Sequence, residues 1–295
     1  MCGSALPADR DNGHVADPIP HRRNVTRARV LAVREGAGHE LSDRLATEEP
    51  MEIRAEGPGQ EPVSVAVTMR TPGADFELAV GFLFTEGLIR GRDDVRVVSY
   101  CEDLADDEQH YNVVTVGLAR SFDPDLVTRN FYAGSSCGIC GKASLDHVEV
   151  RCAPLGPGPS VHGDVIEELP GALSGAQKVF EETGGLHAAG LFAADGTLLS
   201  LREDVGRHNA VDKIVGEAFL AGALPLSERI LLVSGRTSFE IVQKAAVAGI
   251  PVVAAVSAPS SLAVDLAERM GQTVVGFLRD GRFNVYTHPE RIALA

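Results

Sequence analysis

The sequence has no long apolar run, few cysteines and a shortage of basic residues, and each deficit excludes a class of protein. Its apolar runs, such as residues 230–233 and 252–256, are the size of strands, whereas a membrane-spanning helix needs about 18 such residues. Five cysteines are an odd count in a chain of 295 residues and do not suggest a disulfide framework. The N-terminal residues lack the apolar segment of a secretion signal. We therefore expect a cytoplasmic protein that neither spans nor lies on a membrane.

The charge balance is acidic, with 41 acidic against 27 basic side chains and a formal net charge of −14. Such a balance disfavours a general electrostatic grip on nucleic acid or on anionic lipid, although a local basic patch could still bind phosphate. The composition, with 44% hydrophobic and 23% charged residues, is that of a globular protein. The length suits one large or two ordinary domains.

Hydrophobic periodicity divides the chain into four segments. Residues 1–25 have no hydrophobic period and predict a flexible tail. Residues 26–134 contain alternating strand patterns and a helical pattern at 75–89, which predict a smaller α+β domain. Residues 135–160 predict a mobile loop followed by a linker rich in glycine and proline. In residues 161–295 apolar strands alternate with helices, which predicts an α/β domain whose mostly parallel sheet is covered by helices.

Individual elements follow from the same patterns. In the first half we expect strands at residues 27–33, 51–56, 62–69, 95–101 and 111–118, with an acidic solvated loop at 102–109. In the second half we expect helices at residues 171–183, 208–221, 239–248 and 262–270. The strands of the second half are expected at residues 186–193, 197–201, 229–233, 251–256, 273–278 and 283–287.

The most informative local motif is a Cys-x-x-Cys pair, Cys137 and Cys140, flanked by glycines. This spacing allows both sulfurs to bind one metal ion or each other. A structural zinc site needs about four ligands, and Cys101 and Cys152 could supply two more. A thioredoxin-like redox pair and a nucleophilic, sulfur-carrying pair are the alternatives, and Lys142 would raise the thiolate fraction in either case. From the spacing alone, a zinc site is the leading interpretation of the pair, ahead of sulfur or redox chemistry.

Two further enzyme classes can be tested on the histidines. Zinc deaminases use a His-x-Glu motif followed by Pro-Cys-x-x-Cys. Here Ala189 stands where the glutamate is needed, and Ser136 rather than proline precedes Cys137, so deamination is not expected. A nucleotide enzyme with His187 or His208 as general base is a more remote reading.

A second motif lies at the junction of a predicted strand and a predicted helix. It consists of Ser234, Gly235, Arg236, Thr237 and Ser238, and a similar arrangement recurs at residues 257–261. Free backbone N–H groups and the helix dipole attract anions at such junctions, although a hydroxyl that merely caps the helix would explain either motif. Both would lie at the carboxyl ends of neighbouring strands, where open α/β sheets bind ligands.

Two other clusters combine charge with turn residues. Residues 202–209, which include Arg207 and His208, form a polar cluster before a largely apolar helix, so we expect the polar end to face a cleft. Residues 279–282 contain Arg279 and Arg282 between two strand patterns. This segment is either an ordinary hairpin turn or a pair of arginines that bind a nucleotide phosphate.

Together these motifs give the sequence a close resemblance to the FdhD family, the formate dehydrogenase accessory sulfurtransferases. The resemblance runs from about residue 65 to the C-terminus. It rests on five matching stretches: residues 136–141, 183–187, 202–213, 234–238 and 277–287.

The resemblance implies a sulfur carrier that takes persulfide sulfur from a cysteine desulfurase and passes it to the molybdenum cofactor before the cofactor enters formate dehydrogenase. It implies a homodimer and a C-terminal domain with a cytidine deaminase-like fold. Cys137 would hold the persulfide and Cys140 would assist. No resident metal is implied, and the alternative is a zinc-stabilised chaperone that binds the cofactor without transferring sulfur. The residues expected to contact the cofactor, bis(molybdopterin guanine dinucleotide), are His187, Arg207, His208, Ser234, Gly235, Arg236, Thr237, Ser238, Phe277, Leu278, Arg279, Asp280, Gly281 and Arg282.

Overall fold

The computed structural model describes residues 23–101, 110–123 and 153–294. Its α-helices are α1 (Asp75–Thr85), α4 (Gly163–Ala176), α5 (Lys178–Thr183), α6 (Arg207–Leu220), α7 (Phe239–Val247) and α8 (Ser261–Met270). The strands of the first half are β1 (Val25–Arg34), β2 (Ala37–Ala46), β3 (Glu49–Glu56), β4 (Val63–Arg70), β5 (Val95–Tyr100) and β6 (Val113–Leu118). The strands of the second half are β7 (Val161–His162), β8 (His187–Ala193), β9 (Leu198–Asp204), β10 (Arg229–Val233), β11 (Val252–Ala255), β12 (Thr273–Arg279), β13 (Arg282–Val285) and β14 (Ile292–Ala293).

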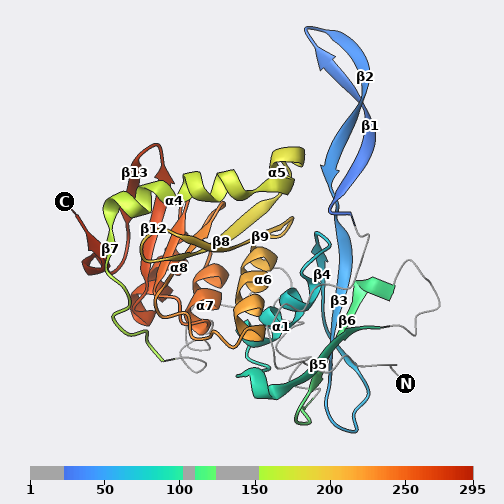
Figure 1. Ribbon diagram of the computed structural model, residues 1–295, viewed down its shortest axis with the longest axis vertical. Helices are drawn as coiled ribbons and strands as arrows, with labels where there is room; N and C mark the ends of the chain where they lie inside the picture. The colour runs from blue at the N-terminus through green and yellow to red at the C-terminus, as the bar shows by residue number, and fades with distance from the viewer. Residues whose placement is uncertain (1–22, 102–109, 124–152, 295) are drawn as a thin grey trace.

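The described residues of the first half form a four-stranded sheet with the helix α1, and a separate hairpin projects from it (Figure 1). The sheet has the order β4-β3-β6-β5, in which only β3 and β6 run parallel. Alternate residues of β3, including Met51 and Ile53, are fully buried under Leu78 and Leu83 of α1. The hairpin consists of β1 and β2, which pair only with each other among the strands that the structure describes. Residue 25, expected at the end of the tail, already belongs to β1; residues 1–22 and the acidic loop 102–109 lie outside the described residues.

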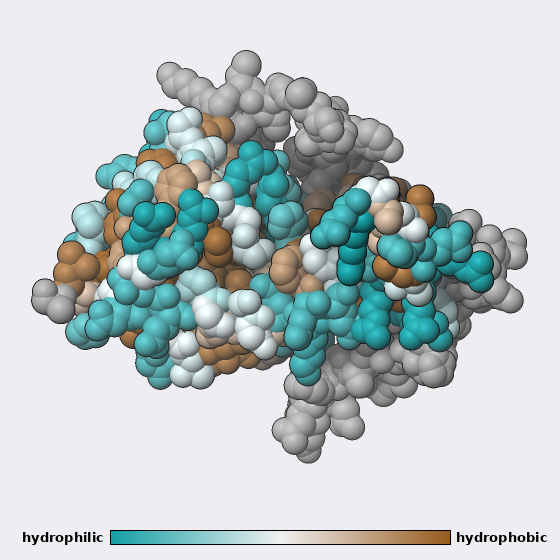
Figure 2. All heavy atoms as spheres, turned by 90° about the horizontal axis from the view of Figure 1, so that it is seen from above, coloured by the Kyte–Doolittle hydropathy of each residue, from teal (hydrophilic) through white to brown (hydrophobic). Residues whose placement is uncertain are grey.

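The surface carries both polar and apolar side chains. Figure 2 views the molecule from above, toward the tip of the hairpin, and hydrophilic residues cover much of the described face, with hydrophobic residues among them. Within the described ranges no helix combines the length and the apolar composition that crossing a membrane requires.

The second half forms a six-stranded sheet with the order β13-β12-β11-β10-β8-β9. The strands β10, β11 and β12 run parallel, whereas β8, β9 and β13 join their neighbours in antiparallel fashion. The sheet is therefore mixed, and the expectation of a mostly parallel sheet was wrong. The pairs β8–β9 and β12–β13 are hairpins. Their turns contain Gly196 and Gly281, each with a positive φ, and such tight turns join antiparallel neighbours.

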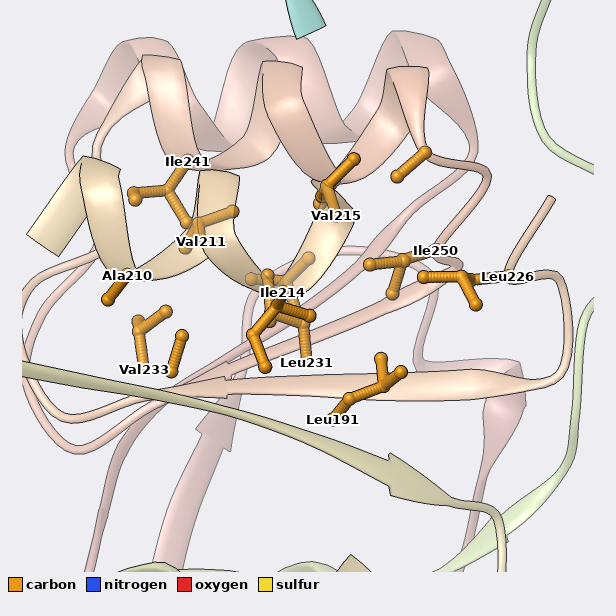
Figure 3. Packing of buried hydrophobic residues seen from close by; sticks show 14 of the residues in the cluster. Leu191, Ala210, Val211, Ile214, Val215, Leu226, Leu231, Val233, Ile241 and Ile250 are labelled. Carbon is orange, nitrogen blue, oxygen red and sulfur yellow. The ribbon is translucent and has the colours of Figure 1, made fainter. Parts of the chain in front are cut away.

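Helices cover both faces of this sheet, as expected. On one face α4 packs Ile166, Leu169 and Leu173 onto the strands. On the other face α6 and α7 pack onto β8, β10 and β11, and Figure 3 shows Ile214 of α6 above Leu231 of β10. The helix α8 packs beside α7. The helix α4 begins at residue 163, eight residues before the predicted start at 171. Pro170, which directly precedes the predicted start, lies inside the helix.

Helices α1 and α6 join the two halves at very close range. A Cβ added to Gly81 of α1 would overlap the carbonyl oxygen of Asp212, and one added to Gly216 of α6 would overlap that of Glu77. Beside this contact Lys244 of α7 lies 2.9 Å from both Asp212 and the Thr85 hydroxyl. Because the loss of one partner of a buried ion pair is strongly destabilising, the pairing of Lys244 with Asp212 holds α7 against α6.

The connection at residues 153–160 has no regular secondary structure but is held in place. The N–H of Leu155 donates to the carbonyl of Met270 at 2.8 Å. Arg291 donates from Nη2 to the carbonyl of Gly156 at 2.8 Å and from Nε to that of Pro157. At the other end of the undescribed segment, Gln60 bonds both the N–H and the carbonyl of Phe122, at 3.0 and 2.8 Å.

Candidate functional site

One edge of the six-stranded sheet collects almost all the polar motifs. The strands β9, β10 and β11 end at this edge, β8 begins there, and α6, α7 and α8 start from it. Three helix N-termini therefore open toward the same edge. Because each N-terminus carries unpaired N–H groups and the positive end of the helix dipole, the edge favours an anionic ligand.

The two similar loops lie side by side at this edge, as the sequence predicted. The N–H of Thr237 donates to the carbonyl of Ala258 at 3.3 Å, and the N–H of Ser260 donates to the carbonyl of Thr237 at 3.0 Å. Capping explains one loop only. Ser260 accepts the N–H of Ala263 and caps α8, whereas Ser238 makes no capping bond to α7.

Two buried polar atoms in this region have no hydrogen-bond partner among the described residues: Nε of Arg207 and Oγ1 of Thr237. Thr237 is 1% exposed. Arg207 lies at the start of α6, and its Cδ, like the ring of His187, is within 4 Å of where a Cβ on Gly235 would be. Gly235 thus leaves room between two side chains that the sequence predicted for the site. Since a buried donor without a partner is costly, these two atoms fit a phosphate oxygen.

The histidines of the site have different surroundings. Burial first, and then the positive charges of Arg207 and His208, lower the pKa of His187 below its ordinary value. Nε2 of His208 lies 2.8 Å from a carboxylate oxygen of Glu240 and 3.1 Å from the Ser238 hydroxyl. The hydrogen bond from His208 holds the pKa of Glu240 below its ordinary value, although burial opposes this. The sequence analysis missed Glu240 because a glutamate in the first turn of a helix is common.

A pocket of about 390 Å³ opens beside these loops. His187 and Ser234 form one side of it, and Ser234 is fixed there because its hydroxyl accepts the N–H of Ala188 at 2.9 Å. Phe180 of α5 contributes an aromatic side chain that is 42% exposed. The remaining lining residues are Gln177, Gly184, Gly185 and Leu186. The sequence analysis assigned Phe180 only to a helix, since nothing in the local pattern distinguishes a pocket wall from a solvated helix face.

The segment at 277–282 divides into two parts. Phe277 has a positive φ and is 36% exposed, and its N–H donates to the carbonyl of Ser257 at 3.1 Å, which places it beside the two loops. Leu278 is fully buried in the core under α4, so its side chain is a packing residue and not a ligand contact. The remaining members are exposed in the β12–β13 hairpin: Arg279, Asp280, Gly281 and Arg282. Arg236 is exposed in the β10–α7 loop.

The polar cluster at 202–213 only partly faces the site. Arg207 and His208 do so, but Asp204 and Lys213 are buried and form an ion pair of 2.7 Å. Lys213 also donates to the carbonyl of Thr71 at 2.9 Å, and Asn209 donates to the carbonyl of Met69 at 2.8 Å. The expectation that the polar end faces a cleft therefore holds only in part, because Asp204, Asn209 and Lys213 instead fasten the second half of the chain to the end of β4.

The cysteine pair cannot be placed in this geometry, because Cys137 and Cys140 lie outside the described residues, as does Cys152. Cys101 follows β5 and is a buried free thiol. Residues 23–101, 110–123 and 153–294 contain no cluster of three or more His, Cys, Asp or Glu side chains suited to a metal ion.

Comparison with known proteins gives a consistent result. A model of the FdhD/NarQ family matches residues 46–293. The sulfur carrier protein FdhD of Mycolicibacterium paratuberculosis is 53% identical over 272 residues, which cover 90% of this chain and 98% of that protein. The sulfur carrier protein FdhD of Streptomyces avermitilis is 51% identical over 278 residues, which cover 92% and 97%. A crystal structure of a formate dehydrogenase accessory protein from Desulfotalea psychrophila superposes with a TM-score of 0.70 at 25% identity, over 92% of this chain and all of that one.

Proposed function

Because the chain belongs to the FdhD/NarQ family, we propose that it is a sulfur carrier that serves formate dehydrogenase in the cytoplasm. It takes sulfur from the persulfide of a cysteine desulfurase and delivers it to the molybdenum cofactor, bis(molybdopterin guanine dinucleotide), before the cofactor enters the enzyme. It works as a homodimer. The two halves of the proposal, acceptance of sulfur and binding of the cofactor, involve different residues and can be tested separately.

Cys137 is the proposed sulfur acceptor. Its thiolate attacks the outer sulfur of the desulfurase persulfide; a bond forms between Cys137 Sγ and that sulfur, the desulfurase S–S bond breaks, and the desulfurase thiolate leaves. No net oxidation occurs in this exchange. Attack by the thiolate of Cys140 on Cys137 Sγ then releases hydrosulfide and leaves a Cys137–Cys140 disulfide, which a cellular thiol must reduce before the next cycle.

The edge with three helix N-termini is the proposed cofactor site, and the observation that carries this assignment is the pair of buried atoms without partners. Arg207 Nε and Thr237 Oγ1 would donate to phosphate oxygens of the cofactor, where the helix N-termini add further N–H groups. Phe180 of the pocket would pack against a guanine ring, since aromatic side chains stack on bases. The cofactor is the client of this site, and it brings the metal that receives the sulfur. We further propose that the second half of the chain has a cytidine deaminase-like fold, in which the same edge binds a nucleotide without the glutamate needed for deamination.

Mass spectrometry after incubation with a desulfurase and cysteine tests the acceptor. We expect one added sulfur atom on the peptide that contains Cys137, removed by thiol. Cys137→Ala should abolish the gain, whereas Cys152→Ala is the matched control and should keep it. If Cys137→Ala still accepts sulfur and restores formate dehydrogenase activity, the proposed acceptor is wrong. Stoichiometric zinc held by Cys137 and Cys140 would instead support a zinc-stabilised chaperone.

A further inference from the structure

The hairpin β1–β2, residues 25–46, forms an arm that belongs to neither of the two larger sheets. Its two ten-residue strands pair with each other and with no other strand of the described chain, and they project away from the body (Figure 1). A two-stranded ribbon is marginally stable alone in water. Four of its large hydrophobic side chains are 38–66% exposed: Leu31, Val33, Leu41 and Leu45. Such a ribbon gains its stability when another surface covers it.

One face of the arm is basic. Arg27 and Arg29 lie two residues apart and therefore on the same face, and Arg44 stands directly opposite Arg27. Arg44 has an acidic partner, Glu182 of α5, at 2.9 Å. Arg27 and Arg29 are exposed and have none within the described part of the chain. Glu40 is the one carboxylate on this face, against three arginines. Like charges opposite each other destabilise a hairpin, so the face keeps an excess of positive charge that an acidic surface would offset.

A complementary surface lies on α4 and α5. These helices carry one basic residue, Lys178, against five exposed carboxylates. The five are Asp164, Glu167, Glu168, Glu181 and Glu182. Asp164 and Glu168 are four residues apart on one helix face, at roughly 6 Å, which matches the spacing of roughly 7 Å between alternate residues of a strand. The pair Arg44–Glu182 already joins the base of the arm to this acidic surface within one chain.

We propose that the arm of one copy lies on α4 of a second copy of this chain, with Arg27 and Arg29 facing Asp164 and Glu168. Because the arm projects beyond its own α4 (Figure 1), a two-fold arrangement lets each copy give an arm and receive one, which makes the interface isologous. The inference rests on the homodimer of the proposed function and names its interface. It adds that the contact is electrostatic at its centre, in a protein whose net charge of −14 would otherwise oppose self-association.

Sedimentation of the full chain over a range of concentrations tests the proposal. We expect a dimer, and we expect the double variant Arg27→Glu, Arg29→Glu to raise its dissociation constant at least about tenfold, since like charges across an interface are strongly unfavourable. The matched control is Arg90→Glu, Arg96→Glu, which changes the net charge equally at two exposed arginines outside the arm; it should sediment like the parent. Raising the salt concentration should weaken the parent dimer.

A charge swap makes the test specific. Adding Asp164→Arg and Glu168→Arg to the arm variant should restore the dimer, whereas these two changes alone should break it. A monomeric parent chain, an arm variant that dimerises like the parent, a swap that fails to rescue, or an arm that binds only the desulfurase would each overturn the proposal. Sulfur uptake on Cys137, measured in the same samples, distinguishes the proposed function from the proposed interface. Failure of the parent chain to take up sulfur contradicts the sulfur carrier, whereas the sedimentation result alone decides whether the arm forms the interface.

Discussion

Gly81 of α1 rests directly on the backbone of Asp212 in α6, with no space for a single additional carbon between them. Gly81→Ala must therefore push the two helices apart, and we expect it to lower the free energy of unfolding by about 1–3 kcal/mol, the usual cost of overpacking. Urea denaturation measures the change. Gly171→Ala in α4 is the matched control, because nothing lies within 4 Å of its added Cβ and alanine favours a helix by about 0.5–1 kcal/mol. Equal free energies of unfolding for the two variants would contradict the predicted cost of separating α1 from α6.

Lys244 connects α7 to Asp212 and Thr85 in a buried polar cluster. Lys244→Met leaves the Asp212 carboxylate buried without its cation, and we expect a loss of about 3–5 kcal/mol in the free energy of unfolding. The exposed Lys178→Met is the control and should stay within about 0.5 kcal/mol of the parent. Adding Asp212→Asn to Lys244→Met should recover part of the loss, and no recovery would show that the lysine acts by packing alone.

Thr237→Val separates ligand binding from folding. The hydroxyl is buried and has no partner among the described residues, so its removal in a side chain of the same shape should leave stability unchanged or slightly higher. If the hydroxyl donates to a phosphate, the same change should weaken binding of guanosine diphosphate, used here as a fragment of the cofactor, by about 1 kcal/mol, or roughly fivefold. Calorimetry measures the affinity, and the capping residue Ser260 provides the contrast: Ser260→Ala should lower stability by about 1 kcal/mol. Unchanged nucleotide affinity in Thr237→Val would remove Thr237 from the site.

His187 provides a pH-dependent probe of the same edge. Its pKa is lowered by burial and by the charges of Arg207 and His208, so the folded protein takes up this proton at a lower pH than the unfolded chain does. The contribution of His187 therefore decreases stability as the pH falls below the unfolded pKa. An anion bound beside the ring should raise the folded pKa, because it favours the charged imidazolium. NMR titration should show this rise with guanosine diphosphate and no rise with guanosine, which lacks phosphate.

Much of the second half of the fold was predictable, because its strands and helices are short, strongly periodic and separated by glycine or proline. The boundaries of β10, α7, β11 and α8 differ from the predicted ones by one residue at most. Strand direction was not predictable, since β8 has the same apolar pattern whether its neighbour runs parallel or antiparallel. The strand β2 was missed because nine of its ten residues are exposed and no alternation of burial marks the sequence.

Some residues of the candidate site could be predicted from their type and their position between a strand and a helix. Gly235 and Thr237 stood out between a strand and a helix, and both lie at the edge with three helix N-termini. Residue type alone did not predict the role of the charged residues, because a charged side chain can form a buried ion pair or face the site. Asp204 and Arg207 are three residues apart in one polar motif, yet the first is sealed in an ion pair with Lys213 and the second reaches the site. Only the tertiary packing of α1 and β4 against α6 distinguishes them.

The fastened residues on either side of residues 124–152 bear on the proposed transfer of sulfur. Gln60 holds Phe122 on one side, and Met270 holds Leu155 on the other. Cys137 is about 15 residues from the first anchor and about 18 from the second, so even a fully extended chain keeps it within roughly 50–60 Å of both. If Cys137 is the sulfur acceptor, as proposed, a sulfur donor and the molybdenum cofactor must both come within this distance of the two anchors. Under that proposal, the positions of Phe122 and Leu155 limit which partners can reach Cys137.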